Sequence, residues 1–297
     1  MAFDLDPELP LGTALRKVAA GQLDGAARSL GRMDDDPDAA VHDIRKRTKK
    51  LRGLLRLFRP GFEETFRAEN RVLRDLARSL SGRRDAAVMA RTARALAPGP
   101  GAAAEALGPL LDRLDAAAEP SGAAGAPSGA VGAALDGLRG RIDAWCVEDA
   151  PAALRKGLGK TYGRAREALQ VVTEDPRAAE FHDLRKRVKY HGFHCRLLRR
   201  AWPDEMAARR DVADRLSDLL GDDHDLSVLA ETLRDDPGMP PDAVAVATAL
   251  IADRSAGLRA RALALAPRLL AEPPGALSRR MAAYWTAEAS RRAARAR

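Results

Sequence analysis

The sequence predicts an all-α protein. Ala, Leu, Arg and Asp dominate its 297 residues, and aromatic residues make up only 4%. This composition favours helices, because strands depend on β-branched and aromatic side chains. Between proline and glycine breaks, apolar residues recur with the 3.6-residue period of an amphipathic helix. The hydrophobic content of 46% can form a substantial core in a chain of this length.

The elements of the first half follow from these breaks. Asp36 offers an N-cap carboxylate and Pro37 suits a first helical turn, so a basic helix is expected to start there. The run Pro98-Gly99-Pro100-Gly101 ends a group of four helices. The expected helices lie near 11–31, 37–59, 62–81, 83–97 and 103–118.

The elements of the second half follow residues 119–130, which are rich in Gly, Ala, Pro and Ser and are expected to form a flexible linker. Asp175 and Pro176 repeat the start signal of the first basic helix, and Gly221 is expected to end a helix. The expected helices lie near 131–149, 158–173, 176–200, 204–220, 223–235, 241–271 and 276–296.

An internal duplication organises the chain. A shift of about 140 residues aligns Val-His-Asp-Ile-Arg-Lys-Arg at 41–47 with Phe-His-Asp-Leu-Arg-Lys-Arg at 181–187, with five identities in seven positions. Downstream, Asp85 aligns with Asp225 at the same shift, and Gly82 aligns with Gly221 after a one-residue adjustment. The duplication predicts a first repeat over about 8–118 and a second over about 131–296. Two four-helix bundles related by a pseudo-twofold axis are the simplest expected architecture.

Positive charge is concentrated in the two repeated helices. Residues 42–59 contain eight Lys and Arg side chains against Asp43, and residues 182–200 contain seven against Asp183. The chain as a whole has 50 cationic and 42 acidic residues, so the remainder is net negative. Such concentration indicates an anionic partner.

The cations of the first basic helix follow its helical period. A row on one face lies beside an apolar stripe of Val41, Ile44, Thr48, Leu51, Leu55 and Phe58. Like charges at this spacing destabilise a helix, and a long polyanion would offset the repulsion. The row comprises His42, Arg45, Lys49, Arg52, Arg56 and Arg59.

The second basic helix repeats this row, with Gly192 interrupting it. Its apolar stripe is Phe181, Leu184, Val188, His191, Cys195 and Leu198, and its row is His182, Arg185, Lys189, Arg196 and Arg199. Two such rows facing one another would form a groove for a linear polyanion. The alternative is that both rows are solvated faces in an Arg-rich chain.

Other basic residues are expected to have no binding role. We expect solvated side chains at five positions off the main row, namely Lys46, Arg47, Lys50, Lys186 and Arg187. Arg78, Arg83 and Arg84 could flank the groove, but the second half is acidic at the corresponding place. They are left outside the expected site.

The histidines allow two interpretations. His42 and His182 occupy equivalent positions before the first Arg of each row, and each could strengthen anion binding as the pH falls or could simply be hydrogen-bonded at a helix start. His191, His194 and Cys195 form a local cluster at helical spacing, but the first half has leucines there. No metal site and no cofactor are expected.

The chain is expected to be a cytoplasmic protein. It has two cysteines, an acidic N-terminus unlike a signal peptide, and no apolar run near the about 18 to 20 residues that span a bilayer. No glycine-rich phosphate loop and no nucleophile elbow are present, so no enzymatic activity is expected.

With both motifs considered, the sequence resembles the CHAD family of conserved-histidine α-helical domains. The resemblance covers residues 8–296, which would form a single domain. It implies two pseudo-twofold-related four-helix bundles around a central basic channel that binds inorganic polyphosphate. Some family members associate with polyphosphate granules, and a partner enzyme of polyphosphate metabolism is a further expectation. Many relatives also carry a CYTH triphosphatase domain, whose Glu-x-Glu-x-Lys strand this sequence lacks, so a stand-alone binding module is expected.

The family signature adds Lys186 to the binding residues that the helical row predicts. The predicted polyphosphate-binding set is therefore His42, Arg45, Lys49, Arg52, Arg56, His182, Arg185, Lys186, Lys189, Arg196 and Arg199. Gly192 stands where the first half has Arg52 and weakens the second row. We expect charge reversal at Arg45 and Arg185 to reduce affinity without changing stability.

Two other functions remain open. Nucleic-acid binding is the first alternative, because phosphate contacts dominate both kinds of ligand. The basic rows lack the aromatic platforms that single strands use. A metal-dependent phosphohydrolase is the second alternative, and it would require three or more converging ligands where only His-Asp pairs are visible.

Overall fold

The computed structural model describes residues 3–80, 82–97, 99–118, 128–236 and 238–295, with side chains except at 82–87 and 117–118. Within these ranges the chain is helical and contains no strand, which confirms the all-α prediction. The first half forms α1 (Leu11–Leu30), α2 (Pro37–Phe58), the 3₁₀ turn η1 (Arg59–Gly61), α3 (Glu63–Ser79), α4 (Gly82–Arg94) and α5 (Ala102–Ala118). The second half forms α6 (Ser128–Arg141), η2 (Ile142–Ala144), α7 (Ala150–Glu174), α8 (Ala178–Leu197), α9 (Pro203–Asp235), α10 (Pro241–Leu269) and α11 (Pro274–Arg295).

The basic helix α2 begins as its sequence predicts. The Asp36 carboxylate accepts a 3.0 Å hydrogen bond from the backbone N–H of Ala39, and Pro37 occupies the first turn. In α2 every predicted stripe residue except the half-buried Val41 is buried, and the whole predicted stripe of α8 is buried. Both stripes therefore face the core, and the cationic rows lie beside them.

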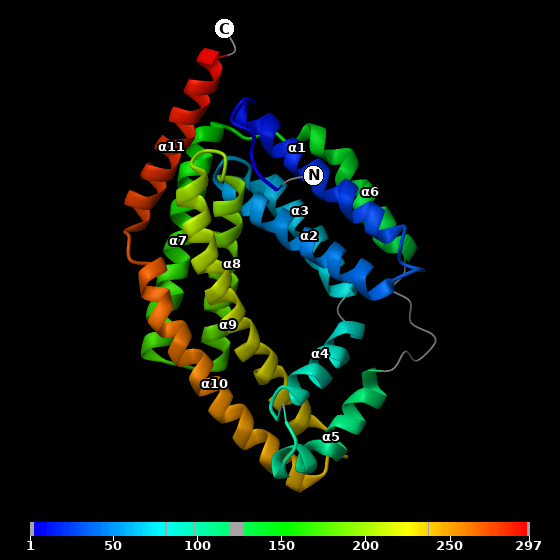
Figure 1. Ribbon diagram of the computed structural model, residues 1–297. Helices are drawn as coiled ribbons and strands as arrows, with labels where there is room; N and C mark the ends of the chain where they lie inside the picture. Colours follow the sequence, from blue (N-terminus) through cyan, green and yellow to red (C-terminus); the bar gives the residue numbers. More distant parts are fainter. Residues whose placement is uncertain (1–2, 81, 98, 119–127, 237, 296–297) are drawn as a thin grey trace.

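Close packing joins α2 to α7. A Cβ atom at Gly157 would lie 1.8 Å from the carbonyl oxygen of Leu57, so only glycine permits this approach of the two helices. Helix α2 also packs against α1, α3 and α8. The two basic helices contact each other where Gly53 of α2 meets Phe193 of α8, and Figure 1 shows them at an angle to one another.

The structure corrects the prediction of a break at Gly221. Helix α9 continues through this residue for 33 residues, where two helices were expected. Its first half buries Leu216 and Leu220 in one hydrophobic cluster, and its second half buries Leu229 and Leu233 in another. This packing outweighs the cost of glycine inside a helix, which is about 1 kcal/mol relative to alanine.

Several other helix starts also differ from the prediction, by one to eight residues. Helix α7 begins at Ala150, eight residues early, because Asp149 caps it by accepting from the N–H of Ala152. Helix α6 begins at Ser128, inside the expected linker, whose residues 119–127 lie outside the described ranges. Helix α8 begins at Ala178, because Asp175 ends α7 instead of capping α8.

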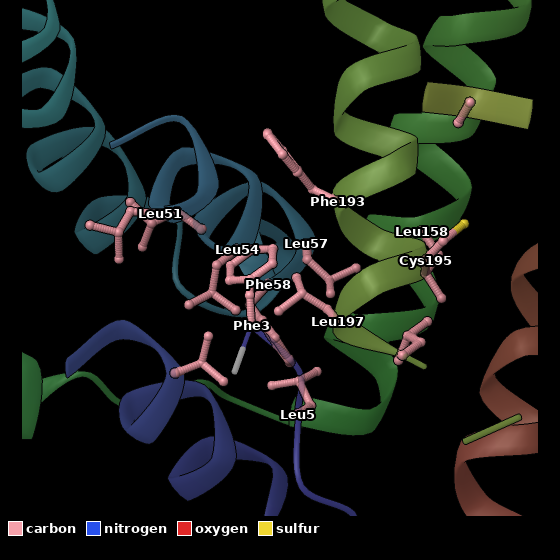
Figure 2. Packing of buried hydrophobic residues seen from close by; sticks show 14 of the residues in the cluster. Phe3, Leu5, Leu51, Leu54, Leu57, Phe58, Leu158, Phe193, Cys195 and Leu197 are labelled. Atoms are coloured by element: carbon pink, nitrogen blue, oxygen red, sulfur yellow. The ribbon is translucent and has the colours of Figure 1, made fainter. Parts of the chain in front are cut away.

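The buried apolar side chains form two clusters. The larger joins α1, α2, α3, α6, α7, α8 and α11 with the first half of α9 and the end of α10. Figure 2 shows part of it, where Phe3 and Leu5 of the N-terminal segment meet Leu54 and Phe58 of α2. The smaller cluster joins α4 and α5 to the second half of α9 and to α10 (Figure 1). The twofold relation between the sequence halves stays a prediction.

No helix in the described ranges combines the length and apolar character needed to cross a membrane.

Candidate functional site

A cleft of about 670 Å³ lies between the two basic helices and α9, with α4 at its edge. Its walls combine cationic side chains from α2 and α8 with carboxylates from α9. The lining residues are His42, Arg45, Lys46, Lys49 and Lys50 of α2, Val88 and Met89 of α4, Arg185, Lys189, Phe193 and Arg196 of α8, and Asp214, Asp218, His224, Asp225 and Val228 of α9.

The cleft brings together six of the eleven predicted site residues. These are His42, Arg45 and Lys49 from the first motif and Arg185, Lys189 and Arg196 from the second. They lie about 140 positions apart in sequence, so the fold is what joins the two rows. Among the described lining residues, seven Lys and Arg side chains stand against three Asp side chains. The cleft therefore favours a ligand with several negative charges.

Two lysines outside the predicted binding set, Lys46 and Lys50, also line the cleft. Lys46 is exposed, as expected, whereas Lys50 is not. Lys50 is half-buried, its ammonium nitrogen lies 5.3 Å from the ring centre of Phe3, and its pKa is lowered by burial and by the nearby Lys46 and Arg196. The two lysines are one turn apart on the face next to the predicted row, so the cleft covers two adjacent faces of α2.

Arg45 connects the cleft to the end of α3. Its Nη1 donates hydrogen bonds to the carbonyl oxygens of Ala77, at 3.3 Å, and Leu80, at 2.9 Å. These carbonyls belong to the last turn of α3, where acceptors lack helical partners and the helix dipole favours a cation. Arg45 is thus both a lining residue and a cap for a neighbouring helix.

Arg185 occupies the matching position of the second motif, and its side chain lies against α9. Its guanidinium approaches Gly221, where an added Cβ would lie 3.3 Å from Nη2. Its Nε is buried and has no hydrogen-bond partner among the described residues. Because α9 does not end at this point, it has no free carbonyls of the kind that Arg45 caps. Arg185 therefore keeps hydrogen-bonding capacity for a ligand.

Lys189 and Arg196 continue the wall formed by α8. Burial lowers the pKa of Lys189, Arg185 lowers it further, and Asp218 and Asp214 oppose the shift. Arg196 donates a 2.7 Å hydrogen bond to Asp214. Asp214 of α9 thus holds Arg196 in position, and the cleft stays net positive.

Two stacked histidines lie behind this wall. The rings of His182 and His224 are 4.0 Å apart, and only His224 lines the cleft. Burial, together with His224, Lys186 and Arg185, lowers the pKa of His182 to about 4. Burial, Arg185, Lys186 and Lys49 lower the pKa of His224. The sequence prediction missed His224, because its partner is 42 positions away and only the fold joins them.

Four other predicted site residues lie away from the cleft. Arg52 donates a 3.1 Å hydrogen bond to Asn70 on α3, and Arg56 stacks 4.5 Å from the ring centre of Tyr190. Lys186 pairs with Asp183 at 3.0 Å, and Arg199 pairs with Asp4 at 2.5 Å. The structure gives each of these four a contact within the protein, and none of them is among the lining residues of the cleft, so their role in binding stays a prediction.

The remaining basic residues of the motifs stabilise their own helices. Arg47 donates a 2.5 Å hydrogen bond to Asp43, and Arg187 donates a 3.0 Å hydrogen bond to Asp183, each pair one helical turn apart. The exposed Arg78 lies 3.7 Å from Asp75. The side chains of Arg83, Arg84 and Asp85 lie outside the described residues.

The cluster of His191, His194 and Cys195 belongs to the core. All three side chains are buried, and His194 Nε2 lies 3.1 Å from the carbonyl oxygen of Gly53. His191 Nε2 lies 3.8 Å from the Cys195 sulfur. Burial lowers the pKa of both histidines, that of His194 to about 4. They are neutral packing residues between α2, α7 and α8. Within the described ranges no three His, Cys, Asp or Glu side chains converge as metal ligands would.

Comparisons with known proteins identify the fold and the family of the chain. The chain is similar in structure to PptA from Streptomyces chartreusis, with a TM-score of 0.60 and 18% identity over 88% of this chain and 100% of that one. At this identity the likeness shows the fold alone. None of the curated proteins matches the sequence significantly. In sequence, residues 17–234 match the CHAD domain family. This match covers more than half of the chain and includes both basic helices that line the cleft, so the protein belongs to the CHAD domain family.

Proposed function

We propose that the cleft between α2, α8 and α9 binds inorganic polyphosphate. The observation that carries this proposal is the convergence of seven Lys and Arg side chains from two distant motifs on one cleft of about 670 Å³. Polyphosphate is a flexible chain with about one negative charge on each phosphate, so it can contact cations from both helices. The family to which the chain belongs implies the same ligand.

The chemistry of the cleft supports recognition of phosphate oxygens. Arginines present planar donor forks, and lysines present compact charges that adapt to a mobile chain. The carboxylates of Asp214, Asp218 and Asp225 all lie on α9. A polyanion bound in the cleft would therefore lie against α2 and α8 and away from α9.

The cleft fits polyphosphate better than single-stranded nucleic acid. Phe193 is the one aromatic ring other than the histidines among its lining residues, so bases would find little surface for stacking. We propose binding without catalysis, in the cytoplasm, where a separate enzyme of polyphosphate metabolism would act on the bound polymer.

A competition experiment tests the proposal. The purified protein is titrated with long-chain polyphosphate in several salt concentrations, with duplex DNA, single-stranded RNA and orthophosphate as competitors. We expect polyphosphate to be bound in preference to all three. Equal binding of every polyanion would contradict a dedicated site and would favour a diffuse electrostatic surface that also takes nucleic acid.

A matched pair of variants locates the site. Lys49→Gln combined with Lys189→Gln removes two cleft cations, whereas Lys156→Gln combined with Arg166→Gln removes two exposed cations of α7 outside the cleft. We expect the first pair to weaken polyphosphate binding by about tenfold or more and the second to leave it nearly unchanged. Equal losses in both would mean that net charge, and not the cleft, determines binding.

A further inference from the structure

A second, smaller basic cavity lies on the other side of α8. It is lined by Arg56, Arg59, Lys160, Thr161, Arg164, Arg187 and Tyr190, from α2, η1, α7 and α8. Arg187 is two residues from both Arg185 and Lys189, which places it about 200° around the helix from the wall of the cleft. No residue that the structure describes lines both cavities, so this small basic cavity is separate from the cleft.

The small basic cavity has an excess of positive charge. Arg59 is paired with Glu63 at 2.6 Å, and Arg187 is paired with Asp183 at 3.0 Å. The other three cations, Arg56, Lys160 and Arg164, make no ion pair with any described carboxylate. Three positive charges thus converge without an ion pair, and Glu167, three residues from Arg164, only partly opposes their repulsion.

Arg56 and Arg164 are both held close to other positive charges of the small basic cavity. The Arg56 guanidinium is held by the ring of Tyr190, 4.5 Å away, and its Nε is buried with no hydrogen-bond partner among the described residues. Arg164 is partly buried, and its pKa is lowered by burial and then by Arg187, Arg59 and Arg56. An arginine cannot lose its proton in a protein, so the repulsion persists unless an anion offsets it.

The cavity is small. The space open to the centre of a water-sized sphere is about 20 Å³, against about 670 Å³ in the cleft. Since roughly 10–15 Å³ of such space holds one water molecule, the cavity accepts one compact group and not a chain. The Thr161 hydroxyl and the fork-shaped arginine donors suit the oxygens of a tetrahedral anion.

We propose that the small basic cavity binds a single oxyanion, with inorganic phosphate as its simplest ligand, independently of the cleft. The repeat supports a role specific to the second half of the chain. A shift of 140 positions replaces Lys160 by Ala20 and Arg164 by Asp24, so the first half lacks the cations that α7 supplies. The proposal does not depend on polyphosphate binding in the cleft, because the two sites share no residue.

Thermal melting in sodium phosphate, compared with sodium chloride at equal ionic strength, tests this proposal. Arg164→Gln removes the central cation, and Arg166→Gln is the matched control, because Arg166 is an exposed arginine of the same helix outside the cavity. Phosphate should raise the melting temperature of the wild type and of Arg166→Gln. In Arg164→Gln the rise should disappear, with phosphate affinity reduced about tenfold or more by calorimetry.

The anion-free state separates binding from a structural role. Without phosphate, Arg164→Gln should melt no lower than the wild type, because the substitution relieves repulsion among like charges. The cleft variant Lys49→Gln with Lys189→Gln should keep the full response to phosphate. The proposal would be overturned if phosphate raised the melting temperature of the wild type no more than chloride does. It would also be overturned if the rise were undiminished in Arg164→Gln or lost in the cleft variant.

Discussion

Arg45 donates a 2.9 Å hydrogen bond to the carbonyl oxygen of Leu80, at the C-terminal end of α3. The equivalent Arg185 lies instead over Gly221 in the middle of α9. The same motif residue therefore caps a helix in one half of the chain and lies on an uninterrupted helix in the other. The two arginines should differ in what they contribute to stability.

Replacing Arg45 by glutamine should destabilise the protein, contrary to the sequence-based expectation of unchanged stability. The substitution removes hydrogen bonds from a charged donor to two carbonyls at a helix end, a loss of about 1 to 3 kcal/mol. Arg185→Gln should change the free energy of unfolding by less than about 0.5 kcal/mol. Urea denaturation of both variants measures the difference, and equal stability of the two would contradict the capping role.

The buried histidine His194 should make the protein less stable in acid. Burial lowers its pKa to about 4, whereas the unfolded chain titrates near 6.5. Between these values the unfolded state binds a proton that the folded state does not, so stability is complete above about pH 6.5 and falls as the pH decreases towards 4. Below about pH 4 the protonation of His194 should have reduced the free energy of unfolding by about 3 kcal/mol.

His194→Gln keeps a donor for the Gly53 carbonyl and removes the titration. The free energy of unfolding, measured by urea denaturation across this pH range, should decline less steeply in the variant. His191 should contribute a loss of the same sign, because burial also lowers its pKa. Parallel pH profiles of wild type and His194→Gln would show that other groups control the acid sensitivity.

Polyphosphate binding should strengthen as the pH falls below neutral. Arg185, Lys186 and Lys49 contribute to the low pKa of His224, and a bound polyanion would offset these charges. The complex would then bind a proton that the free protein does not, so affinity would rise as the pH decreases. The dissociation constant, measured by calorimetry at several pH values, should depend less on pH in His224→Gln. An identical pH dependence in that variant would exclude the His182–His224 pair as the cause.

The two cysteines should differ sharply in reactivity. Cys146 is exposed, whereas burial raises the pKa of Cys195 to about 12. Thiolate is the reactive form, so a thiol reagent should modify Cys146 and spare Cys195 in the folded protein. Mass spectrometry of peptides after labelling locates the modified residue, and labelling in denaturant, where both cysteines should react, is the control. Equal labelling in the native state would mean that the core around Cys195 opens readily.

Local signals predicted the basic helix α2 well, and packing explains where they failed. Asp36 and Pro37 determine its start, and the observed end at Phe58 is one residue from the prediction. Gly221 predicted a break, but its weak preference against helix is smaller than the gain from burying leucines on both sides of it.

The site was predicted only in part for a related reason. Helical periodicity places side chains around their own axis, but it carries no information on how wide an opening neighbouring helices leave. Lys46 and Lys50 were therefore assigned to solvent, and Arg56 was assigned to the same groove as Arg45 although it faces the small basic cavity. A row on one helix identifies candidate binding residues, and the packing of the neighbouring helices determines which of these residues line the same cleft.

The length of α9 has a mechanical consequence. At 1.5 Å per residue, the 33 residues of α9 form one helix about 50 Å long. One end of this helix packs in the larger hydrophobic cluster, and the other end packs in the smaller one. This continuous helix fixes the spacing of its three cleft carboxylates, those of Asp214, Asp218 and Asp225. Closing the cleft at Gly221 would require breaking helical hydrogen bonds, so α9 resists bending there. A polyanion bound as proposed would enter a cleft whose width α9 already fixes, so the ligand would lose conformational freedom while the protein would change little.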